Sequence, residues 1–127
     1  MTPSMITGLA GGLGALAVAL GAFGAHGLRD QLTPERLETW QTAAHYQLVH
    51  AVALVSLAAA LPSLESAWAA RAAWLWVVGV VVFSGSLYAL CLTGVRALGA
   101  ITPLGGLCLI LGWCALVMSA IRAGGTG

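Results

Sequence analysis

The sequence predicts an all-α membrane protein of four transmembrane helices in an up-down bundle. The chain has 127 residues, of which 60% are hydrophobic and 7% are charged. A soluble domain carries about 25% charged residues, so too few polar side chains remain here to cover a water-facing surface. Short connections favour antiparallel packing of sequential helices. We therefore expect one transmembrane domain embedded in the lipid bilayer, with spans at about residues 4–25, 45–61, 72–93 and 103–121.

The charges are few and scattered, which argues against a nucleic-acid partner because phosphate binding needs clustered Arg and Lys. The net charge is +1, and the chain has no Lys. Arg29, Arg36 and Arg96 fall in the loops on one side of the membrane, and Arg71 and Arg122 fall on the other. The positive-inside rule then places the first side in the cytoplasm and both termini outside, a choice that rests on one charge.

The first apolar run, residues 4–25, is long enough to cross a hydrocarbon core of about 30 Å. No positive charge precedes it, so we interpret it as a retained helix and not as a signal peptide. Small residues recur along it and let helix backbones approach closely, although such spacing also arises by chance in a Gly/Ala-rich span. Gly24 or Gly27 is expected to close the helix in the left-handed conformation. The predicted helix-packing residues are Gly8, Gly12, Ala17 and Gly21.

The second helix is expected to start outside the hydrocarbon core. Thr33 suits the N-cap, Pro34 suits the first helical position, and Glu35 complements the positive end of a helix. The following residues form an amphipathic lead-in at the headgroup level, with Trp40 as its interfacial anchor. It continues without a breaker into the second span.

The third and fourth spans have clear end signals. Trp74 and Trp76 lie near the start of the third span, where aromatic belts lie, and Gly94 is a suitable C-cap. Thr102 and Pro103 predict an N-cap and first helical residue for the fourth span. A re-entrant entry over residues 98–106, as some transporters use, is the alternative.

Polar residues inside the spans are the candidate functional residues, because burying them in lipid is costly. Tyr46 and His50 share one helix face, as do Ser84 and Tyr88, so a hydrogen-bonded network between helices is the leading interpretation. A proton or solute path in which His50 titrates is the alternative. The candidate polar patch contains His26, His45, Tyr46, Gln47, His50, Ser84, Ser86 and Tyr88.

Metal, cofactor and catalytic sites are not predicted. His45 and His50 lie about 140° apart around a helix, so one helix does not present both to one metal, although His26 with either stays possible. Cys91, Cys108 and Cys114 are odd in number and lack CxxC spacing, and we interpret them as small buried hydrophobic residues. The four carboxylates fall in loops or at the interface, which favours a protein that is not an enzyme. They are Asp30, Glu35, Glu38 and Glu65.

Four ordered motifs resemble the YgdD/YwdK-like family of small bacterial inner-membrane proteins, to which a eukaryotic transmembrane relative is also similar. The resemblance implies a multi-pass protein of the bacterial plasma membrane, and it implies no activity, because the family has no known function. It covers nearly the whole chain. The motifs are Gly21-Ala22-Phe23-Gly24-Ala25-His26-Gly27-Leu28, Trp40-Gln41-Thr42-Ala43 with Tyr46-Gln47 and His50-Ala51, Phe83-Ser84-Gly85-Ser86-Leu87-Tyr88, and Ile101-Thr102-Pro103-Leu104-Gly105-Gly106 with Gly112-Trp113.

The leading functional hypothesis is a non-enzymatic structural or accessory membrane protein that self-associates, with a further membrane protein as a possible partner. The first alternative is a carrier or channel for a small solute or proton that uses the His50/Tyr88 region. The second alternative is a subunit that binds haem, quinone or a metal.

Overall fold

A computed structural model describes residues 1–125 of the chain. Its long helices are α1 (Pro3–His26), α2 (Pro34–Ala60), α3 (Ser66–Thr93) and α4 (Ala97–Gly124), and a short 3-10 helix, η1 (Leu61–Ser63), follows α2. All four long helices are apolar enough and long enough to cross a membrane. The predicted all-α membrane fold with four spans is confirmed.

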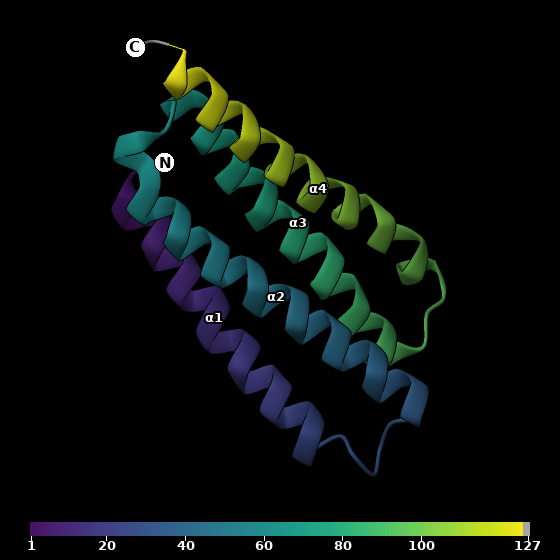
Figure 1. The fold of residues 1–127 in the computed structure, drawn as a ribbon. Coiled ribbons are helices and arrows are strands. Elements are labelled where there is room, and N and C mark those ends of the chain that lie inside the picture. Colours follow the sequence, from purple (N-terminus) through teal and green to yellow (C-terminus); the bar gives the residue numbers. More distant parts are fainter. Residues whose placement is uncertain (126–127) are drawn as a thin grey trace.

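The four helices stand side by side in chain order, each antiparallel to the next (Figure 1). The main interfaces join α1 to α2, α2 to α3, and α3 to α4. The up-down connectivity is as predicted, and the bundle takes the form of an open row. Helices α1 and α4 therefore lie at the two edges, and each keeps an outer face that no helix of the described chain covers.

Helix α2 begins where the sequence predicts and unites the amphipathic lead-in with the second span. The hydroxyl of Thr33 accepts from the Arg36 amide at 3.3 Å, and Pro34 is the first helical residue. Helix α3, in contrast, starts at Ser66 and not near residue 72, because the Glu65 carboxylate caps it. Most of the predicted turn before the third span is therefore helix.

Two predicted helix ends are wrong. Gly27 closes α1 with φ −78°, a right-handed conformation, whereas Gly94 closes α3 with φ 72°, as expected for a left-handed C-cap. Helix α4 already begins at Ala97, so Pro103 lies inside it and Thr102 is not its N-cap. The Thr102 hydroxyl donates to the Leu98 carbonyl one turn earlier, at 3.2 Å, as a residue inside a helix can. A continuous helix also replaces the re-entrant alternative.

Helices α3 and α4 pack by inserting large side chains against glycines. Trp76 lies against Gly112, and Phe83 lies against Gly105, where an added Cβ would meet the Phe83 backbone. A Cβ on Gly79 would lie 2.5 Å from Leu109 Cδ2. These glycines set the close approach of the two helices, which is how van der Waals packing replaces the hydrophobic effect within lipid.

Candidate functional site

Gln47 is the centre of a polar cluster between α1, α2 and α3. It is 2% exposed, and its Nε2 donates to the Leu13 carbonyl of α1 at 2.9 Å. The Tyr88 hydroxyl of α3 donates to Gln47 Oε1 at 2.8 Å. Nearby, Trp40 Nε1 donates to the Leu20 carbonyl at 2.7 Å. Two side chains of α2 thus bind backbone carbonyls of α1 and tie the first helix to the row.

The serines of α3 make separate interhelical bonds. Ser84 is buried, and its hydroxyl donates to the Ala43 carbonyl of α2 at 2.8 Å. The Ser86 hydroxyl lies 2.6 Å from that of Thr102 in α4. Ser84 thus joins α3 to α2 and Ser86 joins α3 to α4, and each bond of this kind is worth about 0.6 kcal/mol.

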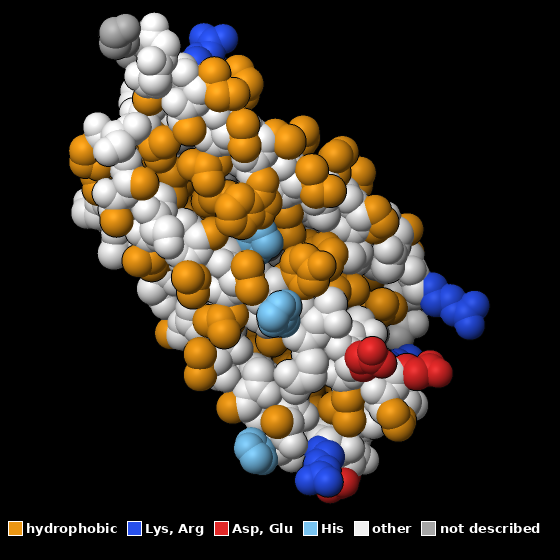
Figure 2. Space-filling view, in the orientation of Figure 1, with side chains coloured by type: hydrophobic (Ala, Val, Ile, Leu, Met, Phe, Trp, Pro, Cys, Tyr) orange, Lys and Arg blue, Asp and Glu red, His pale blue; other side chains and the backbone are white. Residues whose placement is uncertain are grey.

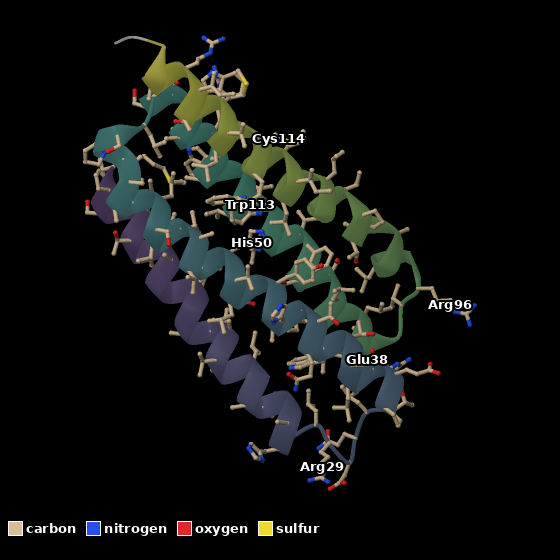
Figure 3. All side chains as sticks on the ribbon, viewed as in Figure 1. Arg29, Glu38, His50, Arg96, Trp113 and Cys114 are labelled. Atoms are coloured by element: carbon tan, nitrogen blue, oxygen red, sulfur yellow. The ribbon has the colours of Figure 1, made fainter. Side chains whose placement is uncertain are left out.

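His50 lies apart from Gln47, in a group of rings between α2, α3 and α4. Its Nδ1 lies 2.8 Å from the Tyr46 carbonyl, and the Trp113 indole donates to its Nε2 at 3.2 Å (Figure 3). Because Nε2 accepts, the proton of the neutral ring is on Nδ1, which donates to that carbonyl. Both ring nitrogens are therefore engaged within the protein.

An apolar groove of about 390 Å³ opens above these rings, lined by α2, α3 and α4. Figure 2 shows this hollow, with a histidine visible among hydrophobic side chains. Trp76 and Trp113 line it, with ring centroids 4.6 Å apart. Trp76 Nε1 is buried without a hydrogen-bond partner in the described residues. The groove therefore offers mainly dispersion contacts.

Two residues of the predicted patch, His26 and His45, are exposed. The Tyr46 side chain is 42% exposed, and its ring lies beside that of His50, with centroids 6.4 Å apart and planes inclined by 13°. The structure thus divides the patch into the Gln47 cluster, the serine contacts and the His50 rings. Among residues 1–125, no three His, Cys, Asp or Glu side chains come close enough to share a metal ion.

The three cysteines differ in how deeply they are buried. Cys91 is buried and its thiol donates to the Arg36 carbonyl at 3.2 Å, whereas Cys114 is exposed, so the interpretation of all three cysteines as buried is wrong.

The four predicted packing residues of α1 lie on two different sides of the helix. Ala17 and Gly21 face α2, and a Cβ on Gly21 would lie 3.9 Å from the Ala44 Cβ. The other two predicted packing residues, Gly8 and Gly12, face away from the fold.

Sequence reasoning missed the roles of several tryptophans and of the α3 and α4 ends. Trp40 and Trp76 were expected at the membrane interface and Trp113 was given only as part of a motif, yet each lies in an interhelical contact. Where α3 begins and α4 ends, the Ser119 hydroxyl of α4 donates to the carbonyl of Glu65, the N-cap of α3, at 2.6 Å. The pairing of a tryptophan with a glycine on another helix leaves no local signal, because it depends on the register between helices.

Comparison with known proteins gives the family. Residues 20–106 match the family described as protein of unknown function (DUF423). The chain is 46% identical over 112 residues to a UPF0382 membrane protein of Staphylococcus epidermidis (strain ATCC 12228 / FDA PCI 1200), covering 87% of this chain and 89% of the relative. This chain belongs to that family.

A second relative supports the same assignment. The UPF0382 membrane protein YwdK of Bacillus subtilis is 44% identical over 108 residues, covering 84% of this chain and 88% of the relative. No solved structure matches. The chain is thus a multi-pass protein of the bacterial plasma membrane, and its resemblance to the YgdD/YwdK-like family is confirmed. Its biochemical function is unknown.

Proposed function

We propose that this protein is a non-enzymatic membrane protein that self-associates as a dimer through the outer face of α1. The observation that carries the proposal is the make-up of that face, called here the α1 small-residue face. It lies on the side of the helix opposite Ala10, Ala17 and Gly24, which are buried against the fold. Its members are all exposed: Ser4, Gly8, Gly11, Gly12, Ala15, Ala19 and Ala22.

Within residues 1–125, the glycines of this face make no close packing contact that would require a residue without a side chain. A Cβ added at Gly8, Gly11 or Gly12 would meet no heavy atom within 4 Å. On the inner side of the same helix, a Cβ on Gly14 would lie 3.6 Å from the Ala51 Cβ. Glycine in a helix interior is less favourable than alanine by about 1 kcal/mol, so unused glycines favour a role in contact with another molecule.

A second copy of the chain is the partner that fits. Close approach of two transmembrane helices requires small residues on both. The other edge of the row, the outer face of α4, carries bulky side chains such as Leu107 and Ile110, which are 52% and 62% exposed. The matching surface is therefore the α1 small-residue face of another copy. A contact between two identical faces has two-fold symmetry and closes at two subunits.

The polar interior supports a structural role over a carrier. A proton path needs a titratable group that faces the path. Both nitrogens of His50 are bound by Tyr46 and Trp113, and the Tyr88 hydroxyl is bound by Gln47. The bond to Tyr46 lies within α2, whereas the bond between Trp113 and His50 joins α4 to α2 and the bond between Tyr88 and Gln47 joins α3 to α2, as in a packing network.

Disulfide crosslinking in native membranes tests the dimer. The starting variant carries Cys108→Ala and Cys114→Ala and keeps Cys91, which is 1% exposed. Adding Ala15→Cys places a thiol on the α1 small-residue face. We expect mild oxidation to give a crosslinked dimer, because two-fold packing brings the two thiols together.

The matched control is a chain that keeps native Cys114, which is exposed on α4, and carries Cys108→Ala. We expect it to stay uncrosslinked under the same conditions. Equal crosslinking of both chains would indicate random collision and contradict the proposal. A strictly monomeric protein in native mass spectrometry from mild detergent would contradict it as well.

A further inference from the structure

Arg71 and Arg122 both lie close to Trp68, at the end of the bundle where α3 begins and α4 ends. The Arg71 guanidinium carbon lies 4.4 Å from the Trp68 ring centroid, and that of Arg122 lies 5.8 Å from it. They border an open cleft of about 610 Å³ that Glu65 and Ile121 also line. Two elements far apart in sequence thus bring two positive charges to one cleft.

The acid in this cleft is already engaged by the protein. Glu65 Oε2 accepts from the Trp68 amide at 2.9 Å, and Oε1 accepts from the Ala67 amide at 3.0 Å. These bonds to the backbone amides of Trp68 and Ala67 lower the pKa of the Glu65 carboxyl, so it stays ionised. Its charge is balanced by the positive end of α3. Arg122 and Arg71 attract the ionised carboxylate more weakly than these amides do, so two positive charges share the cleft with one negative charge.

The position of the cleft identifies the anion it would meet. Trp68 is near the first turn of α3, and Arg122 is near the last turn of α4, so both lie where the helices leave the hydrocarbon core. Tryptophan marks the headgroup level of a bilayer, and the anions concentrated there are lipid phosphates. Paired guanidinium groups present forked donors that match phosphate oxygens.

We propose that Arg71, Arg122 and Trp68 form a binding site for the phosphate of an anionic phospholipid. The lipid chains would then run along the bulky outer face of α4, where Ile121 lines the cleft and is 62% exposed. The Trp68 ring orients both guanidinium groups by cation–π contacts. Nothing in this site depends on the α1 small-residue face, so it stands apart from the proposed dimer.

Lipid titration tests the site. The full chain in neutral detergent is titrated with phosphatidylglycerol or with phosphatidylcholine, and native mass spectrometry counts the lipids that each protein retains. We expect wild type to retain phosphatidylglycerol in preference to phosphatidylcholine. The double variant R71Q/R122Q should bind phosphatidylglycerol about 30-fold more weakly, since each arginine near a lipid surface contributes about fivefold.

The matched control is R29Q/R96Q, which removes two arginines from the connections at the other end of the bundle, between α1 and α2 and between α3 and α4. This variant should bind phosphatidylglycerol as wild type does. Circular dichroism verifies that each variant folds. If the double variant fails to fold, R71Q and R122Q are tested singly, each with an expected loss of about fivefold. Unchanged phosphatidylglycerol binding in the folded arginine variants would overturn the proposal. Equal retention of phosphatidylcholine, or displacement by an equal concentration of inorganic phosphate, would also overturn it.

Discussion

The two edge helices of the row, α1 and α4, present opposite kinds of surface to their surroundings. The middle of the outer face of α1 is a stripe of Ser, Gly and Ala, which exposed bulky side chains such as Leu16 and Val18 border. The outer face of α4 exposes Leu107, Ile110, Val117 and Ile121, each more than half exposed. Both helices contain many glycines, but α4 turns Gly105 and Gly112 inward against α3, whereas α1 turns Gly8 and Gly12 outward.

This difference distinguishes a helix face that contacts lipid chains from one that contacts another helix. Flexible acyl chains conform to bulky, irregular side chains, so the α4 face suits lipid. A smooth face of small residues gives lipid fewer contacts and lets a rigid helix come close. Apolar composition is similar in the two helices, so the size and placement of side chains distinguish a lipid-facing surface from a protein-facing one.

Gly105→Ala should have the largest effect and tests the inward glycines of α4. The new methyl group would meet the Phe83 backbone, which cannot move aside. Overpacking of this kind costs about 1–3 kcal/mol, so we expect that loss in the free energy of unfolding. Gly8→Ala is the matched variant on α1 and should leave monomer stability unchanged or raise it by up to about 1 kcal/mol. Unfolding in mixed micelles measures both, and equal losses would remove the distinction between the two helices.

The double variant Gly8→Leu with Gly12→Leu should break self-association while sparing the fold. Leucines on the α1 small-residue face hold two helices apart, so we expect the dissociation constant to rise about tenfold or more, equal to about 1.4 kcal/mol. Energy transfer between labelled copies in vesicles measures it. Ile110→Leu with Val117→Leu, on α4, is the control and should leave the constant unchanged. An unchanged constant in the glycine variant would contradict the assignment of the face.

Gln47→Leu tests how α1 is held in the row. It removes the bonds to the Leu13 carbonyl and to the Tyr88 hydroxyl. At about 0.6 kcal/mol for each bond, we expect a loss of about 1 kcal/mol in unfolding free energy. Tyr88→Phe removes one of the two bonds and should cost about half as much. A loss in Tyr88→Phe equal to or larger than that in Gln47→Leu would contradict this division between the two bonds, because phenylalanine keeps the ring that packs on Trp40 at a centroid distance of 4.7 Å.

Glu65→Gln should have the smallest effect and applies to the end of α3 beside α4. Bonds from the Trp68 and Ala67 amides hold the Glu65 pKa below its ordinary value of 4.5. A carboxyl with a lowered pKa stabilises the folded state above pH 4.5, and this contribution fades as the pH falls through 4.5 and ends below the folded pKa. The thermal midpoint of wild type should therefore fall more than that of Glu65→Gln over this range. Parallel pH profiles would contradict the capping role.

The sequence predicts the membrane fold well because hydropathy and helix-end signals are local. The runs of apolar residues define the four spans, and Thr33, Pro34 and Gly94 act at helix ends as their types suggest. The start of α4 could not be read in the same way. Pro103 is a helix-start signal on its own, whereas the actual start at Ala97 has no side-chain capping bond that would mark it in the sequence.

The candidate site was predicted only in part, because its partners lie on different helices. Gln47, His50 and Ser84 were identified since polar residues stand out in an apolar span, and they are buried as expected. Their grouping was not predictable. Whether His50 meets Tyr88 or Trp113 depends on the rotation and register of α2, α3 and α4, which no single segment encodes. The pairing of Arg71 with Arg122 depends in the same way on two helix ends meeting.

The ring pair in the α2–α4 groove gives the protein an intrinsic optical signal. Trp76 and Trp113 lie with centroids 4.6 Å apart and planes inclined by 58°. Indole transitions at this separation couple to one another, and a fixed, non-parallel geometry makes the coupled bands chiral. The far-ultraviolet circular dichroism of the native protein, where the strongest indole transition lies, should therefore contain a paired band of opposite signs that either Trp76→Phe or Trp113→Phe removes. That band would report directly, without any added label, on whether α3 and α4 are docked.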